Sequence, residues 1–294
     1  MFRRLVLALC FLAYPAAAGD HLMVCGADEV IRIDPAASPA KRLWSWSAAD
    51  CDELPADLKN AFATTDECKP VDGGKHLLVS SSGGGCALLD LPSGKTLWWA
   101  RVTNAHSIEA LPGGRIAVAS SVGTTGNKVV LFDRHVPEEP ITELPLKSAH
   151  GLVWDDGRKL LWALGYDILI ACRIDGDSLE KMQSHELPDA DGHDLRAVPG
   201  SQELMLSTHK GVWLFDREKH TFRPQPRMHD WETVKCIDIH PANGRIAVVR
   251  AEGGNWWTDT VRFLGPEGGT PVDGEKVLYK ARWITDGKPV NPPH

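Results

Sequence analysis

The chain has 294 residues, 43% of them hydrophobic, and a formal net charge of −7 at pH 7. This length exceeds the usual size of one domain, but all-β barrels and propellers reach it as a single unit. An acidic chain is a poor candidate for binding nucleic acid or an anionic membrane surface through its net charge.

Residues 1–18 have the pattern of a secretory signal peptide. Arg3 and Arg4 begin it, Leu5–Tyr14 is a short apolar run, and Ala16–Ala18 is a small-residue cleavage site. The apolar run is too short to span a bilayer, and no later segment is longer and equally apolar. We therefore expect residues 19–294 to form one exported domain, periplasmic or extracellular, without a membrane span.

Short strand-like segments follow at the N-terminus. The segments 22–25, 29–34 and 42–47 predict the second, third and fourth strands of a blade that lacks its first strand. The segment 56–63 predicts an inserted loop or short helix, and the whole insertion, 50–65, could cover a channel mouth. An unpaired strand is predicted at 279–284, and pairing it with the N-terminal strands would leave no open edge.

A pattern of a short strand and a Gly-containing turn repeats between these ends. The repeats begin at Asp66, His106, His150, His193, Lys235 and Lys280, at spacings of 40, 44, 43, 42 and 45 residues. Second and third apolar strands follow the turn in most repeats, as at 115–120 and 129–133. Periods near forty with several short strands are typical of propeller blades. The sequence predicts an all-β, six-bladed β-propeller, with seven blades as the alternative.

Six cysteines remain after the predicted cleavage, and none forms a CxxC pair, which argues against zinc-finger and thioredoxin-like folds. Most lie in apolar strand patterns, where cysteine acts as a small hydrophobic residue. Cys51 lies in a polar loop instead. In an oxidising compartment, Cys51–Cys68 is therefore the disulfide to test first.

One predicted blade contains a familiar motif. The segment Gly85–Trp99 resembles the tryptophan-docking repeat of quinoprotein propellers. This resemblance implies a structural turn and a tryptophan that packs between blades. Quinone-dependent enzymes of that type are larger and have more blades, so we expect no quinone. The chain also has no phosphate-binding glycine loop, so we expect no nucleotide.

A wider resemblance covers nearly all of residues 19–294. It is carried by the segments Asp66–Val71, Asn104–Glu109, Ala149–Asp155, Gly192–Leu195, Trp256–Asp259 and Tyr279–Trp283. In this order they are similar to an uncharacterised family of exported bacterial WD40-like β-propellers, a domain of unknown function. The resemblance implies the propeller fold and export, and it implies no substrate.

The repeat places a polar residue at the first position of every blade. Because the innermost strands surround the central channel, one repeated position becomes a ring around the axis. The third position is mostly apolar, with Arg282 as the charged exception, and the fourth adds more polar groups. We expect substrate-binding residues here, namely Asp66, Glu67, Lys69, Glu109 and Arg196.

Three imidazoles in this ring suggest a metal. His106, His150 and His193, flanked by a carboxylate, are the usual ligands of a catalytic Zn²⁺ or Mn²⁺ ion with an open position. The alternatives are a metal-free polar site and inert filling of the channel by hydrogen-bonded histidines.

Cationic residues in the ring favour an anionic ligand. The first hypothesis is a metal-dependent lyase or hydrolase acting on an anionic saccharide, by analogy with propeller lyases. Arg282 would neutralise a substrate carboxylate, and Lys235 or Lys280 would remove the adjacent proton as the catalytic base. The second hypothesis is a non-catalytic module that binds a small anionic ligand, an oligosaccharide or a protein.

Two adjacent tryptophans offer an aromatic surface. Trp256 and Trp257 follow Gly253 and Gly254, so they could form a sugar-stacking platform on a loop or pack between blades. We expect a monomer that binds no nucleic acid.

Overall fold

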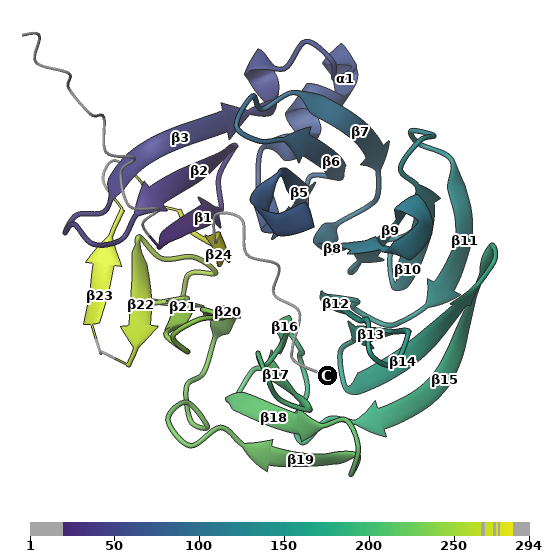
Figure 1. Cartoon of the computed structure of the whole chain (residues 1–294), viewed down its shortest axis with the longest axis vertical. Helices are drawn as coiled ribbons and strands as arrows, with labels where there is room; N and C mark the ends of the chain where they lie inside the picture. The colour runs from purple at the N-terminus through teal and green to yellow at the C-terminus, as the bar shows by residue number, and fades with distance from the viewer. Residues whose placement is uncertain (1–19, 266–267, 273–274, 276, 285–294) are drawn as a thin grey trace, which may run out of the picture.

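The computed structural model describes residues 20–265, 268–272, 275 and 277–284, so the predicted signal peptide lies outside the described residues. Within this part of the chain, the strands form six four-stranded antiparallel sheets, arranged as blades around a central channel (Figure 1). The six-bladed prediction is confirmed over the seven-bladed alternative. No helix among the described residues is long and apolar enough to cross a membrane.

Five blades are continuous in the chain, and each has its first strand at the channel. The second blade contains β4 (Thr65–Val71), β5 (His76–Ser81), β6 (Gly85–Asp90) and β7 (Thr96–Arg101). The third contains β8 (Ala105–Leu111), β9 (Arg115–Ser120), β10 (Lys128–Asp133) and β11 (Pro140–Pro145). The fourth contains β12 (Gly151–Asp155), β13 (Leu160–Leu164), β14 (Ile168–Asp175) and β15 (Ser178–Glu186). The fifth contains β16 (Asp194–Ala197), β17 (Glu203–Ser207), β18 (Val212–Asp216) and β19 (Thr221–Pro224). The sixth contains β20 (Val234–Ile239), β21 (Ile246–Arg250), β22 (Thr260–Leu264) and β23 (Gly268–Pro271).

The first blade joins strands from both ends of the chain, as predicted. Its strands are β24 (Lys280–Ile284), β1 (His21–Cys25), β2 (Glu29–Asp34) and β3 (Lys41–Ser47). The inner strand β24 pairs with β1 so that Lys280 lies opposite Cys25 and Ile284 opposite His21. The C-terminal strand thereby closes the ring.

The second strands of the blades are buried on both faces because each blade packs between two neighbours. This explains continuous apolar runs such as β5 and β9, which are almost wholly buried. Trp98 is fully buried and contacts Phe132 of the next blade edge to face, with ring centroids 5.4 Å apart. Trp98 is therefore a tryptophan that packs between blades, as the resemblance of Gly85–Trp99 implies. Truncating such a residue typically costs about 3–5 kcal/mol of stability.

The segment between β3 and β4 contains the short helix α1 (Ala56–Lys59) between two 3-10 turns, Ala48–Asp50 and Asn60–Phe62. It lies at the outer edge of the ring, away from the central channel (Figure 1). Phe62 packs on Trp46 with ring centroids 5.4 Å apart. It also requires glycine at position 85, where a Cβ would lie 2.5 Å from the Phe62 ring.

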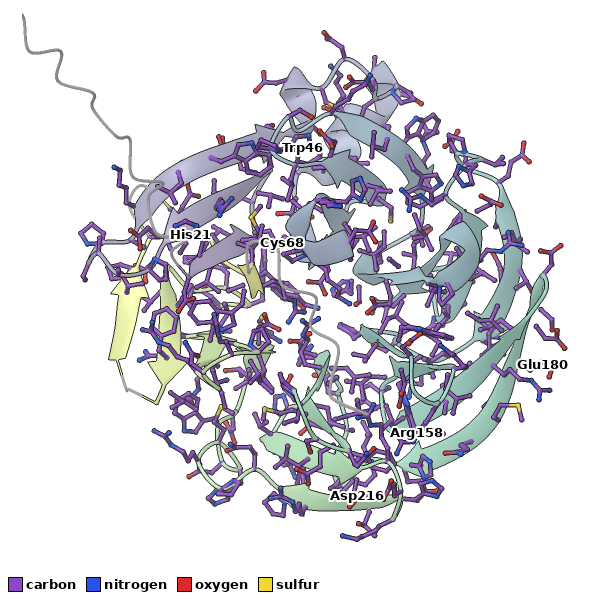
Figure 2. All side chains as sticks on the ribbon, in the orientation of Figure 1. His21, Trp46, Cys68, Arg158, Glu180 and Asp216 are labelled. Carbon is purple, nitrogen blue, oxygen red and sulfur yellow. The ribbon has the colours of Figure 1, made fainter. Side chains whose placement is uncertain are left out.

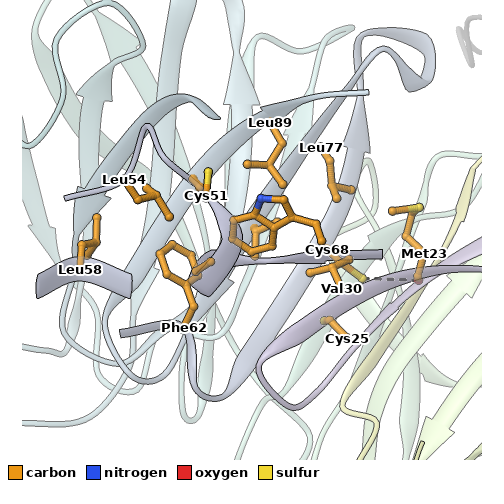
Figure 3. Packing of buried hydrophobic residues seen from close by; sticks show 14 of the residues in the cluster. Met23, Cys25, Val30, Cys51, Leu54, Leu58, Phe62, Cys68, Leu77 and Leu89 are labelled. Atoms are coloured by element: carbon orange, nitrogen blue, oxygen red, sulfur yellow. Dashed lines mark hydrogen bonds between the residues drawn. The ribbon is translucent and has the colours of Figure 1, made fainter. Parts of the chain in front are cut away.

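The predicted disulfide between Cys51 and Cys68 is wrong: both cysteines are free thiols. Cys51 packs in the cluster around Trp46 and contacts the Thr96 hydroxyl at 2.9 Å (Figure 3). Cys68 lies on the inner strand β4, with its sulfur 3.4 Å from the carbonyl of Met23. Trp46 lies toward the outer edge of the blade and Cys68 near the channel (Figure 2). Both thiols belong to this hydrophobic cluster, but their polar contacts differ.

Candidate functional site

The central channel contains three successive layers of polar residues, because six inner strands run side by side along it. The first layer, here called the histidine mouth, contains Asp66, His106, His150, His193, Lys235 and Tyr279. The second, the ion-pair layer, contains Glu67, Asp194, Lys280 and Arg282. The third lies at the opposite ends of the strands and opens into a cavity of about 1290 Å³, here called the funnel.

Local backbone irregularities aim side chains into the histidine mouth. The pairing of β4, β8 and β20 with the following strand skips one residue, so that Asp66, His106 and Lys235 sit at β-bulges. Bulges re-aim side chains and are frequent beside functional sites.

A second backbone irregularity recurs two residues before four members of the mouth. Asn104, Ser148, Asp191 and Thr233 have φ values of 50°, 48°, 66° and 61°, in the left-handed region. For a β-branched residue such as Thr233 this conformation is an outlier. Strain of this kind costs of order 1–3 kcal/mol per residue and clusters at functional sites.

Three imidazoles stack edge to face along the mouth. The ring centroids of His106 and His150 are 4.4 Å apart, and those of His150 and His193 are 5.2 Å apart. Burial lowers the pKa of His106 to about 3 and that of His150 well below its usual value, so both rings are neutral at pH 7. Their Nδ1–H groups donate to the carbonyls of Asn104 (3.2 Å) and Ser148 (2.9 Å). The Nε2 lone pairs are therefore available to accept.

His193 has a different set of neighbours. Its Nε2 lies 2.8 Å from the Lys235 ammonium and 3.3 Å from a carboxylate oxygen of Asp191. Its Nδ1 is buried and has no hydrogen-bond partner among the described residues. Burial lowers the pKa of both His193 and Lys235.

Asp66 is a buried carboxyl group opposite a neutral imidazole. One oxygen accepts a hydrogen bond from the Ser82 amide, and the other lies 3.7 Å from Nε2 of His106. Burial raises the pKa of Asp66 to about 7. Asp66 can therefore hold a proton near neutral pH, which few carboxyl groups do.

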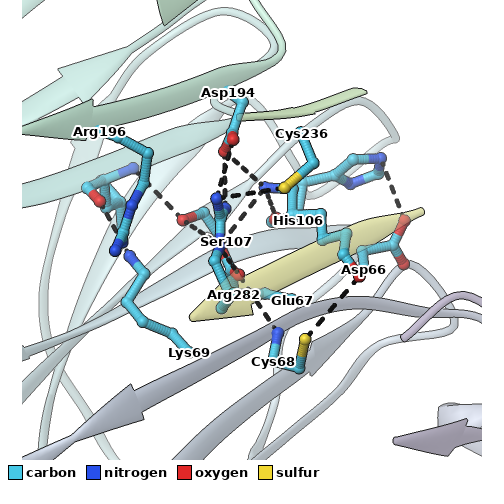
Figure 4. Close-up of polar contacts among 12 residues, drawn as sticks. Asp66, Glu67, Cys68, Lys69, His106, Ser107, Asp194, Arg196, Cys236 and Arg282 are labelled. Carbon is cyan, nitrogen blue, oxygen red and sulfur yellow. Dashed lines mark hydrogen bonds and ion pairs between the residues drawn. The ribbon is translucent and has the colours of Figure 1, made fainter. Parts of the chain in front are cut away.

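In the ion-pair layer, Arg282 lies between Glu67 and Asp194 (Figure 4). Arg282 binds both oxygens of Glu67 and both oxygens of Asp194, at 2.7–2.9 Å. Lys280 adds contacts of 3.3 Å to each of these carboxylates. Burial alone would raise the pKa of Glu67, but Arg282 and Lys280 hold it well below its usual value. The four charges therefore neutralise one another.

The structure places Lys280 and Arg282 deeper than the sequence repeat predicts. Both side chains are inside the ion-pair layer with 0% exposure, together with Glu67. Lys280 pairs with Cys25 without a bulge, so its side chain points into the layer. Tyr279, the residue before it, contacts His106 at a centroid distance of 6.0 Å. Lys280 and Arg282 are therefore buried among ion-pair partners and are not exposed in the mouth.

Three other predicted binding residues lie at the opposite end of the channel. Lys69, Glu109 and Arg196 line the floor of the funnel. Lys69 donates to Glu109 at 2.9 Å, and Arg196 contacts Asp238 at 2.6 Å. The sequence-predicted site is therefore divided between the two ends of the propeller.

Of the two loop tryptophans, Trp256 lies beside the histidine mouth. Its ring is 45% exposed and contacts Tyr279 at a centroid distance of 5.9 Å. Trp256 thus extends the mouth toward solvent as an aromatic surface, whereas Trp257 is partly buried.

The histidines do not form a metal site as they stand. No group of three or more His, Cys, Asp or Glu side chains among the described residues has an arrangement that could hold a metal ion. The rings contact one another edge to face, and the Nε2 of His193 is already occupied by Lys235 and Asp191. We therefore derive no chemistry from a bound metal.

Sequence reasoning missed three residues of the channel. Tyr279 immediately precedes the last repeat, so a one-residue shift of register would have found it. Asp194 shares the second repeat position with Glu67, and pairing these two with Arg282 would have indicated a buried network. Asp191 lies in a loop outside the repeat, and only the fold brings it to His193.

Comparisons with known proteins identify the fold and the family. The structure titled "Crystal structure of Nidogen/Laminin Complex" has a chain with 13% identity and a TM-score of 0.63, covering 92% of this chain and 100% of that one. Hydrazine synthase of Kuenenia stuttgartiensis has 16% identity and a TM-score of 0.54, covering 78% of this chain and 71% of that one. At these identities the likeness concerns the fold alone. A comparison with curated proteins finds no match. The model of a family of unknown function, DUF6528, matches residues 25–293, and the chain belongs to this family.

Proposed function

We propose that the histidine mouth binds a small anionic ligand, with an anionic saccharide as the substrate class and elimination or hydrolysis as the reaction class. The observation that carries this proposal is the contact between Lys235 and His193, which leaves at least one polar atom without a partner in either protonation arrangement.

The first arrangement has Lys235 as an ammonium that donates to Nε2 of His193. The imidazole proton must then be on Nδ1, which is buried and has no acceptor among the described residues. In the second arrangement, Nε2–H donates to Asp191 and Lys235 loses its acceptor. Leaving a buried polar group unpaired costs about 1–3 kcal/mol.

An anionic ligand would remove this conflict. Its carboxylate would accept from Lys235, which would free Nε2–H of His193 to donate to Asp191. Nδ1 of His193 would then carry no proton and would need no acceptor. Asp66, which retains its proton near neutral pH, would act as a proton donor. The exposed ring of Trp256 provides a flat apolar surface for a sugar ring.

The proposal is tested by calorimetric titration with trigalacturonate, using neutral maltotriose as the matched ligand. We expect trigalacturonate to bind more tightly, and Lys235→Met to weaken its binding at least about tenfold. Lys210→Met, at an exposed lysine between β17 and β18, should leave the affinity unchanged. Ultraviolet absorbance of an unsaturated product would establish elimination, and new reducing ends alone would establish hydrolysis. Binding without turnover would support the non-catalytic alternative, and equal affinity for both trisaccharides would refute the proposal.

A further inference from the structure

The funnel is a large cavity at the other end of the channel from the histidine mouth. Its volume of about 1290 Å³ exceeds the roughly 300–1,000 Å³ of pockets for drug-sized ligands. Inner strands of five blades contribute to its floor, through Lys69, Glu109, Arg196, Asp238 and Trp283. A ligand of several sugar residues would fit this space.

Charged side chains line the funnel, and each already has a partner of opposite charge. On the floor, Lys69 pairs with Glu109 and Arg196 with Asp238. On the wall, the remaining pairs are Arg158–Asp155 (3.2 Å), Arg217–Asp155 (2.6 Å), Arg158–Glu218 (3.6 Å), Lys159–Asp156 (2.7 Å) and Arg134–Asp72 (3.9 Å). A charged ligand would have to compete with these ion pairs.

A neutral hydroxylated ligand faces no such competition. A hydroxyl group both donates and accepts, so it can accept from the cation and donate to the anion of one ion pair. In this respect the funnel differs from the histidine mouth, where Lys235 has no carboxylate within ion-pair distance among the described residues. The ion-pair layer, whose side chains are almost wholly buried, separates the two ends.

Aromatic and amide groups add to the lining. Trp154 is partly exposed, and its indole N–H donates to Asp156 at 3.3 Å. Trp283 on the floor is 6% exposed, and its Nε1 has no hydrogen-bond partner among the described residues. Gln202 accepts from Arg158 at 2.7 Å and presents a planar amide to the wall. Flat apolar faces beside paired polar groups suit the faces and edges of sugar rings.

We propose that the funnel is a second binding site, independent of the histidine mouth, for a neutral oligosaccharide. The ion pairs of the floor and wall hydrogen-bond its hydroxyl groups, and Trp154 stacks on a ring. Because no net charge is neutralised on binding, the affinity depends little on salt.

The test is calorimetric titration of the full chain with cellotetraose, maltotetraose and chitin tetraose, against the charged tetragalacturonate and chitosan tetramer. We expect at least one neutral tetrasaccharide to bind, with less than a twofold change in Kd between low and high salt. Trp154→Ala should raise this Kd at least tenfold. Trp99→Ala, on the outer strand β7, is the matched control and should leave it unchanged.

Three outcomes overturn the proposal. The first two are that no neutral tetrasaccharide binds to the wild type, or that a charged one binds the funnel more tightly. The third is an equal loss of affinity in Trp154→Ala and Trp99→Ala, because the ligand would then not be in the funnel. If Trp154→Ala fails to fold, Gln202→Ala replaces it, with an expected loss of threefold or more. Failure of trigalacturonate to bind at the histidine mouth leaves this test intact, because the ligands and residues differ.

Discussion

Arg282 forms two parallel hydrogen bonds with Glu67, from Nε to Oε1 at 2.7 Å and from Nη2 to Oε2 at 2.9 Å. The two residues come from neighbouring inner strands, β24 and β4, and are 215 residues apart in the chain. The same guanidinium binds Asp194 on β16 at 2.7 Å. One side chain therefore connects three blades at the axis, in addition to the hydrogen bonds by which β24 closes the first blade.

Replacing this guanidinium should be strongly destabilising. Arg282→Met leaves Glu67 and Asp194 buried, with Lys280 as their one remaining ion-pair partner among the described residues, and breaking a buried ion pair typically costs about 3–5 kcal/mol. We expect a loss of this size in the free energy of unfolding, measured by urea denaturation.

The control for this measurement is a bidentate pair of the same geometry on the surface. Arg223 binds Glu203 with two hydrogen bonds of 2.9 Å, and its side chain is 53% exposed. Arg223→Met should cost less than about 1 kcal/mol, because solvent screens the pair. Similar losses for the two variants would show that burial does not set the strength of the Arg282 network.

Closure of the ring provides a second prediction. Deleting residues 280–294 removes β24, which exposes an edge of β1 and eliminates the ion-pair layer. We expect the cooperative thermal transition to be lost, since blades are stabilised by their neighbours. Deleting 285–294 alone is the control and should preserve the transition. A normal melt of the longer deletion would contradict this role of β24.

The sequence was sufficient for the fold because blade formation depends on a repeated local pattern. Alternating turns and apolar strands determine each blade, and the unpaired strands at 22–47 and 279–284 indicate closure. The site was predicted less well, since its geometry depends on register. Lys280 stands at the polar first position of its repeat, but β24 has no bulge there. Its side chain therefore points into the ion-pair layer, and Tyr279 lies beside His106 instead. The repeat positions alone also do not show that Lys69 and His106 lie at opposite ends of the channel.

The carboxyl group of Asp66 makes stability depend on pH. Burial raises its pKa to about 7 from an ordinary 3.8, so between these values the folded protein holds a proton that the unfolded chain releases. This stabilising contribution is complete below about pH 4 and is lost as the pH rises through about 7. The comparison of the wild type with Asp66→Asn isolates this carboxyl group. Both proteins contain the charged and titratable neighbours of Asp66, which are His106, Lys280 and Glu67.

We therefore expect the wild type to lose stability relative to Asp66→Asn as the pH rises from about 4 to about 8. The free energy of unfolding should fall by up to ~1.4 kcal/mol per pH unit. Urea denaturation of both proteins across this range measures the difference. A difference that does not vary with pH would show that Asp66 has an ordinary pKa.

The middle imidazole of the mouth separates a binding site from channel filling. His150 contacts both other histidines and donates to the Ser148 carbonyl. If the mouth is a site, His150→Ala should change the free energy of unfolding by less than about 1 kcal/mol, because functional polar clusters often reduce stability. Its Kd for trigalacturonate should rise at least about tenfold. If the ring only fills the channel, stability should fall by about 1–3 kcal/mol while ligand binding stays unchanged.

Thermal melts of both proteins with trigalacturonate, Zn²⁺ or Mn²⁺ distinguish these results. A melting temperature that either metal raises in the wild type, and not in His150→Ala, would contradict the metal-free site and show that the imidazoles rearrange around an ion.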